Sequence, residues 1–224
     1  MVVSVSSADD DAIVEGACQT GFASGRAARY SRLHTMTDRE VLDLFRQSGA
    51  LLEGHFKLSS GLHSDRYLQS ALVLQHPEFA ERLGRALAER TRHLQPTAVL
   101  SPALGGIVIG QEVARALQVR ALFAERQERT LTLRRGFTLE PADRVLIVED
   151  VITTGGSTRE TMAVAQAAGA QVVGAASIID RGADGGRLGV PLQSLVTMQV
   201  AAHDPSSCPL CAQGVPVVKP GSRA

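Results

Sequence analysis

Two adjacent carboxylates and a short glycine turn stand together near the middle of the chain. Glu149 and Asp150 end the apolar run 145–148, and residues 153–158 read Thr-Thr-Gly-Gly-Ser-Thr. The apolar run predicts a strand buried on both faces of a parallel sheet. The turn predicts the start of a helix near Arg159, where free N–H groups and the positive end of the helix dipole favour a phosphate. Glycines allow the backbone to approach such a ligand closely.

The acid pair and the turn suit different parts of one ligand. Carboxylates repel phosphate but accept hydrogen bonds from the hydroxyls of a ribose, so together they predict a sugar-phosphate site. The alternative is an ordinary strand-to-helix turn, but such a turn has no use for two carboxylates at the end of a buried strand. A P-loop is excluded because no lysine follows Gly155 and Gly156. A Rossmann fingerprint is excluded because the acids stand where its glycines should be.

The bulk composition narrows the class of protein. The chain has 224 residues, of which 44% are hydrophobic, which is enough for one α/β domain with small additions. Its formal net charge is zero, so no general attraction to nucleic acid is expected. No apolar run is long enough to span a membrane. Three cysteines argue against a disulfide scaffold, and the N-terminus lacks a basic signal region, so we expect a cytoplasmic protein.

The N-terminal part of the chain divides at Met36. Residues 1–35 are rich in small and polar residues without a sustained period, and we expect disorder there. An alternative is that Met36 is the true start. Thr37 and Glu40 form a capping-box pattern that begins a helix. The stretch 51–70 then predicts two strands joined by a turn at Ser60-Gly61.

Strands and helices alternate over the rest of the chain. A helix is expected from Pro77 to about Arg92, and another carries Ile109, Val113, Ala116 and Leu117. Short apolar runs predict strands at 98–100, 121–124, 145–148, 172–179 and near 195–200. This alternation is typical of an α/β fold in which a mostly parallel central sheet has helices on both faces. The charged stretch 125–138 predicts a hairpin on the surface.

The sequence resembles one known family over most of the chain. The acid pair and its turn resemble the phosphoribosyl-pyrophosphate (PRPP) loop of type I phosphoribosyltransferases. The stretch Gly-His-Phe-x-Leu-x-Ser-Gly-x-His-Ser, which begins at Gly54, is similar to the orotate-specific members. The resemblance covers roughly residues 37–223. It implies the type I phosphoribosyltransferase fold, with a small hood (about 36–75), a core (about 76–200), a mobile hairpin loop and a C-terminal tail (about 201–224).

The resemblance also implies an activity. It implies transfer of phosphoribose from PRPP to orotate, giving orotidine 5′-phosphate and pyrophosphate in pyrimidine synthesis. It further implies Mg²⁺, held mainly by substrate oxygens and water, and a homodimer with shared active sites. The catalytic residues would be Glu149, Asp150 and Arg126. The PRPP-binding residues would be Arg126, Arg129, Arg135, Glu149, Asp150, Val151, Ile152, Thr153, Thr154, Gly155, Gly156 and Ser157.

The same resemblance assigns residues to orotate. Arg181 would bind the orotate carboxylate, because a planar guanidinium suits two oxygens, and Thr153 would also contact orotate. The alternative for Arg181 is a solvated side chain in a glycine-rich loop. Tyr67, with its neighbours Leu68 and Gln69, is a weaker candidate for the base pocket, since a place in the core or at a strand edge is equally open.

Lysines that the family pattern leads us to expect are absent. Gln127, Ser59 and Gly105 occupy three such positions, and 125–138 contains neither lysine nor histidine. Positive charge near pyrophosphate would then come from Arg126, Arg129, Arg134 and Arg135, unless they only form a solvated hairpin. Because arginine is a poor proton donor, we expect catalysis by charge neutralisation rather than by proton donation. The alternative is that Lys57 is displaced into the site and serves there.

Cys208 and Cys211 have the spacing of a zinc knuckle but supply only half of a tetrahedral site. His203 is a candidate third ligand and a dimer mate could supply more, but free thiols are the interpretation that the sequence favours. His55 and His63 flank the Ser60-Gly61 turn and are expected to support that loop.

Two other functions remain open. A related transferase for a purine or for uracil is disfavoured by the stretch that begins at Gly54 and by Arg181, since a neutral base needs no carboxylate clamp. A regulator that senses PRPP without turnover would be consistent with the absent lysines. If it bound nucleic acid, however, it should show a basic surface or an added DNA-binding domain.

Overall fold

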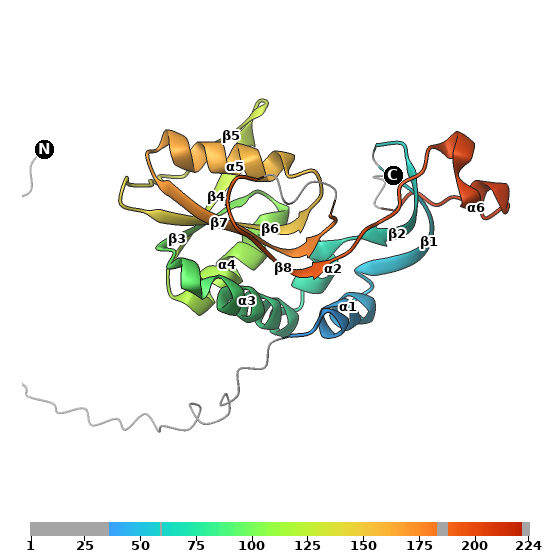
Figure 1. The fold of residues 1–224 in the computed structure, drawn as a ribbon, viewed down its shortest axis with the longest axis horizontal. Helices are drawn as coiled ribbons and strands as arrows, with labels where there is room; N and C mark the ends of the chain where they lie inside the picture. The colour runs from blue at the N-terminus through green and yellow to red at the C-terminus, as the bar shows by residue number, and fades with distance from the viewer. Residues whose placement is uncertain (1–35, 59, 183–187, 221–224) are drawn as a thin grey trace, which may run out of the picture. The chain divides into compact units, whose positions relative to one another are not determined.

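The computed structural model describes residues 36–58, 60–182 and 188–220. These belong to one compact unit, Thr35–Ala224. The expected disorder of residues 1–35 falls outside the described residues. A six-stranded sheet forms the centre of the unit, and all neighbouring strands are parallel except β4 and β5. The strands lie in the order β5 (Thr130–Leu133), β4 (Arg120–Gln127), β3 (Ala98–Pro102), β6 (Arg144–Ile152), β7 (Gln171–Asp180) and β8 (Leu192–Thr197) (Figure 1).

The sheet is buried on both faces, as predicted. Along β6, Leu146 and Val148 join one hydrophobic cluster, while Val145 and Ile147 join the other. This alternation follows from the period of two along a strand. Helices α3 (Pro77–Thr91) and α4 (Gly105–Leu117) cover one face, and α5 (Gly156–Ala167) covers the other (Figure 1).

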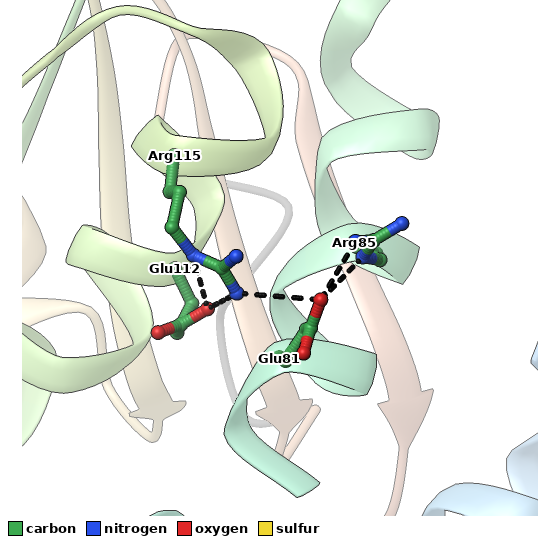
Figure 2. A network of polar contacts seen from close by, with 4 residues as sticks. All are labelled: Glu81, Arg85, Glu112 and Arg115. Carbon is green, nitrogen blue, oxygen red and sulfur yellow. Dashed lines mark hydrogen bonds and ion pairs between the residues drawn. The ribbon is translucent and has the colours of Figure 1, made fainter. Parts of the chain in front are cut away.

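Helices α3 and α4 approach each other closely at Gly84. A Cβ atom built on Gly84 would lie 2.8 Å from the backbone carbonyl carbon of Glu112, so no side chain fits there. Charged residues join the same two helices at the surface (Figure 2). Glu81 binds Arg85 at 2.6 Å and lies 3.6 Å from Arg115, which also pairs with Glu112. The arginines lower the pKa of the Glu81 carboxyl, chiefly through the hydrogen bond from Arg85.

The hood comprises α1 (Asp38–Gln47), the antiparallel pair β1 (Leu51–Lys57) and β2 (His63–Leu68), and the short α2 (Ser70–Leu74). Thr37 and Glu40 form the predicted capping box at the start of α1.

The C-terminal tail follows both outer edges of this strand pair. The N–H of His63 donates to the carbonyl of His203, and the N–H of Lys57 donates to that of Val218, each at 2.8 Å. The tail also carries a 3₁₀ turn (Pro205–Ser207) and the short α6 (Pro209–Ala212).

Several boundaries differ from the sequence prediction, among them the ends of β3 and β4, which run on to Pro102 and Gln127. Helix α5 begins at Gly156 rather than near Arg159, because Gly155 takes a left-handed conformation (φ +71°) and ends the turn early. Strand β6 runs on through the acid pair to Ile152, and β8 ends at Thr197 rather than near residue 200. Helix α2 and the 3₁₀ turn η1 (Arg92–Leu94) were not predicted. Among the described residues, no helix combines the length and apolar character needed to cross a membrane.

Candidate active site

The two carboxylates lie at the carboxyl end of the central strand β6. The pairing of β3 with β6 ends at Leu100 and Ile147, so Glu149 and Asp150 lie beyond the last residues that these two strands pair. Helix α4 begins beside this acid pair: a Cβ atom built on Gly105 would lie 2.8 Å from Oδ1 of Asp150. Ligands of open α/β sheets bind beyond the carboxyl ends of the strands. The acid pair therefore occupies the position where such a site is expected.

Glu149 is held by the first residues of α5. Its carboxylate accepts hydrogen bonds from the hydroxyl of Ser157, at 2.9 Å for Oε2, and from the hydroxyl of Thr158. The side chain is only 5% exposed. Burial raises the pKa of the Glu149 carboxyl, the two hydroxyl donors oppose that rise, and the charge of Asp150 adds to it. Glu149 thus ties the first residues of α5 to the end of β6.

The turn leaves backbone groups available next to the acids. Thr153 and Thr154 are exposed, and α5 begins immediately after Gly155. The first N–H groups of a helix have no partner within the helix and carry the positive end of its dipole. Arg159 folds back and donates to the carbonyl of Thr154 at 2.6 Å, which places a further positive charge beside the turn.

The predicted hairpin forms from β4 and β5, and two of its arginines, Arg126 and Arg135, are held in ion pairs. Arg126 pairs with Glu160 of α5 at 2.9 Å and donates to the carbonyl of Arg129 at 2.8 Å. Arg135 makes a bidentate ion pair with Glu125, with N–O distances of 2.6 and 2.8 Å, and this pair lowers the pKa of the Glu125 carboxyl. Arg126 therefore lies beside the helix that follows the turn, whereas Arg135 points toward its own hairpin.

Arg181 follows β7, next to the end of β6. Its backbone N–H donates to the carbonyl of Ile152 at 2.9 Å. The guanidinium Nε is buried without a hydrogen-bond partner among the described residues, and burial lowers the pKa of this arginine. Arg181 lines a cavity of about 430 Å³ with Gly182, Gln199, Val200 and Ala201. Because a buried unpaired donor is costly, this geometry suits a ligand that accepts hydrogen bonds there.

Other candidates lie elsewhere. Tyr67 packs against Phe56, with ring centres 6.0 Å apart, so its contact here is within the hood. Cys208 and Cys211 do not gather around the His203 side chain but around His55 and His63. Sequence reasoning missed this pairing. It also missed the contact between Gly105 and Asp150. For the cysteine–histidine cluster, the sequence held two signals: the Cys208–Cys211 spacing and the two histidines eight residues apart in the stretch that begins at Gly54.

Comparison with known proteins agrees with this geometry. A family profile described as the phosphoribosyl transferase domain matches residues 70–205, which include the acid pair, the turn and Arg181. The orotate phosphoribosyltransferase of Pelotomaculum thermopropionicum is 53% identical over 188 residues, covering 84% of this chain and 99% of that protein. The orotate phosphoribosyltransferase of Carboxydothermus hydrogenoformans is also 53% identical, over 82% of this chain and 97% of its own length.

Solved structures show the same fold. The crystal structure of orotate phosphoribosyltransferase from Aeropyrum pernix has a TM-score of 0.59 and 26% identity, and the match covers 71% of this chain and 94% of that one. The fold and site define a phosphoribosyltransferase. Because these two relatives are 53% identical to it over 99% and 97% of their own length, the chain belongs to the orotate phosphoribosyltransferase family.

Proposed function

We propose that the protein transfers the phosphoribosyl group of PRPP to orotate, giving orotidine 5′-phosphate and pyrophosphate in the synthesis of pyrimidine nucleotides. The observation that carries this proposal is the placement of an acid pair and a glycine turn at the end of β6, with Arg181 tied to the same strand end and its Nε buried without a partner among the described residues. The first group suits a ribose phosphate and the second suits a carboxylate.

The turn and the acids bind opposite ends of PRPP. The 5′-phosphate takes the N–H groups of residues 153–157, where the dipole of α5 favours an anion. Asp150, which has no hydrogen bond or ion pair recorded within the described ranges, accepts from one ribose hydroxyl. Glu149 accepts from the other, since a carboxylate offers about four acceptor positions and two hydroxyls occupy only part of them. Val151 and Ile152 hold this geometry through the β6–β7 pairing.

Reaction breaks the bond between C1 of the ribose and the pyrophosphate oxygen, which takes the electron pair. N1 of orotate bonds to C1, and the proton of N1 leaves to water or to the released pyrophosphate. The two carboxylates favour the positive charge that develops on the ring. Arg126 leaves Glu160 to neutralise the departing pyrophosphate, and Arg129, Arg134 and Arg135 add charge from the hairpin. Since no lysine serves there, turnover depends on charge and not on a proton donor. An essential acid near neutral pH in the pH profile of kcat would contradict this.

Mg²⁺ fits this site as a partner of the substrate. Among the described residues, Glu149 and Asp150 belong to no group of three or more ligands able to hold a metal. Mg²⁺ commonly binds through one or two carboxylates together with phosphate oxygens and water. Asp150 is the carboxylate available for it, and the ion would neutralise charge on the pyrophosphate.

Orotate occupies the cavity beside Arg181. Its carboxylate pairs with the guanidinium, which satisfies the buried Nε. Thr153, which also contacts orotate, directly follows Ile152, whose carbonyl accepts from the N–H of Arg181. The oligomeric state, the cellular location and the partners stay predictions. We expect a homodimer with shared active sites in the cytoplasm, with no nucleic-acid or membrane partner. Light scattering of the purified chain would test the dimer.

The direct test follows orotate absorbance with PRPP and Mg²⁺. We expect consumption by the wild-type chain, and Arg181→Ala should raise the KM for orotate roughly 30-fold or more, since loss of a buried charge partner costs at least about 2 kcal/mol. The KM for PRPP should change much less. Arg82→Ala, on the exposed side of α3, is the matched control. A folded wild-type chain that consumes no orotate would overturn the proposal.

A further inference from the structure

Four side chains converge on one point far from the acid pair in sequence. They are His55 of β1, His63 of β2, and Cys208 and Cys211 at the start and within α6, and their ligand atoms all lie within 4.8 Å of one another. Among the described residues, this is the group of histidines, cysteines and acids whose ligand atoms could hold a metal ion. We propose that these residues form a structural zinc site that fastens the C-terminal tail to the hood.

The spacing of the ligand atoms fits a single tetrahedral ion. Nε2 of His55 lies 3.5 Å from Sγ of Cys208 and 3.8 Å from Sγ of Cys211, while Nδ1 of His63 lies 3.3 Å from Sγ of Cys211. Zinc bonds of about 2.0–2.1 Å to nitrogen and about 2.3 Å to sulfur place such atoms roughly 3.3–3.8 Å apart. The two ring nitrogens are closer, at 2.9 Å, and need to separate by only a few tenths of an ångström.

The orientation of His55 is fixed by a second contact. Its Nδ1 lies 2.7 Å from the carbonyl oxygen of Val215, an acceptor, so Nδ1 carries the hydrogen. The lone pair of a neutral ring is therefore on Nε2, the atom that faces the two sulfurs and His63. Metal-bound histidines characteristically donate their other ring N–H to a carbonyl or carboxylate in this way.

The chemistry of the four groups selects the ion. Two thiolates and two neutral imidazoles balance the charge of a divalent ion, which suits a cluster in which His55, His63 and Cys208 are 6% exposed or less. Thiolate and imidazole ligands favour zinc over the hard ions Mg²⁺ and Ca²⁺. Cys211 is exposed, so an ion can enter from the solvent. Four protein ligands leave no open position, which is typical of a structural rather than a catalytic zinc.

The site joins segments that the backbone already brings together. His63 pairs with His203, and the N–H of Val218 donates to the carbonyl of His55 at 2.8 Å, so the tail meets both strands of the hood on either side of the cysteines. Helix α6 spans only Pro209–Ala212 and contributes no fully buried side chain of its own. An ion bound to residues about 150 positions apart would supply the stability that so short a helix lacks.

Metal analysis of the full chain, purified without a polyhistidine tag or chelator and with a thiol reductant, tests the site. We expect about one zinc per chain. Cys208→Ser combined with Cys211→Ser should abolish it, and Cys18→Ser, which removes the remaining cysteine, should leave it unchanged. A metal-free wild-type chain, equal zinc in the double variant, or a Cys208–Cys211 disulfide under these conditions would overturn the proposal.

A spectroscopic measurement covers the case in which the double variant fails to fold. Cobalt exchanged into the wild-type chain should give the intense visible bands of a tetrahedral ion and a thiolate-to-cobalt charge-transfer band. His63→Ala should weaken them, with the charge-transfer band retained. Removing zinc from the wild type should lower Tm by several degrees, and adding zinc should restore it. Weak bands of the octahedral type, or a Tm that stays the same when zinc is removed and added back, would contradict a structural site.

Discussion

Gly105 at the start of α4 lies directly against the carboxylate of Asp150 at the end of β6. A Cβ atom on Gly105 would be 2.8 Å from Oδ1 and 3.0 Å from Oδ2 of that carboxylate. The position where the family resemblance leads us to expect a lysine therefore has no room for any side chain while Asp150 keeps this orientation. The glycine and the acid form one unit of the site.

Gly105→Ala should consequently impair function more than stability. The methyl group would push away the end of a flexible side chain, which costs at most about 1 kcal/mol in unfolding free energy. The displaced carboxylate would no longer meet the ribose, so kcat/KM for PRPP should fall about tenfold or more. Kinetics and thermal unfolding of the same preparation measure both effects. Unchanged kinetics with a lowered Tm would contradict the assignment.

Glu149→Gln should raise the free energy of unfolding relative to the wild type at higher pH, while it lowers activity. The carboxyl has an ordinary pKa of 4.5, raised in the fold chiefly by burial. The protonated form is thus favoured by folding, so its contribution to stability is present below pH 4.5 and is lost as pH rises through the raised pKa. Glutamine stays neutral and can still accept from Ser157 and Thr158. The variant should therefore gain stability relative to the wild type as pH rises through that range.

Unfolding in denaturant at a series of pH values measures this difference. Orotate turnover should fall in the same variant because the ribose loses a charged partner. A difference in unfolding free energy that stays constant with pH, or that shrinks as pH rises, would show that Glu149 is not destabilised by ionisation in the fold.

Much of this architecture was predictable because it depends on local patterns. The capping box at Thr37, the apolar run of β6 and the proline at the start of α3 act within a few residues, and each prediction is confirmed. The start of α5 was misplaced because the left-handed conformation of Gly155 has no unambiguous local signal. The contacts of Gly105 with Asp150 and of His55 with Cys208 join residues 45 and 153 positions apart. Only tertiary packing brings them together.

Glu160→Gln should make Arg126 more available to the substrate. The Arg126–Glu160 pair is about half exposed, at 49% and 44%, so it contributes no more than about 1 kcal/mol. Breaking this ion pair should lower the KM for PRPP by at most about fivefold. Arg126→Ala should instead reduce kcat/KM by about 100-fold, because the positive charge that neutralises the leaving group is lost. Steady-state kinetics with varied PRPP compare the two. Equal effects in the same direction would argue that Arg126 serves only the ion pair.

Gly84→Ala should destabilise the fold by about 1–3 kcal/mol, because the new methyl group meets the backbone of Glu112 at the crossing of α3 and α4. Glu81→Gln removes a charge from the ion-pair network of the same helices (Figure 2) and should cost no more than about 1 kcal/mol. Denaturant unfolding ranks the two variants. A larger loss for Glu81→Gln would mean that the surface charges, not the close packing, hold these helices together.

Calorimetric titration of the full chain with PRPP and Mg²⁺ tests the central claim most directly. The proposed site predicts saturable binding by the wild type and affinity at least about tenfold weaker for Asp150→Asn, with Arg181→Ala close to the wild type because it acts on the other substrate. A wild-type chain that takes up no PRPP, or an Asp150→Asn variant that binds it as tightly, would contradict the account.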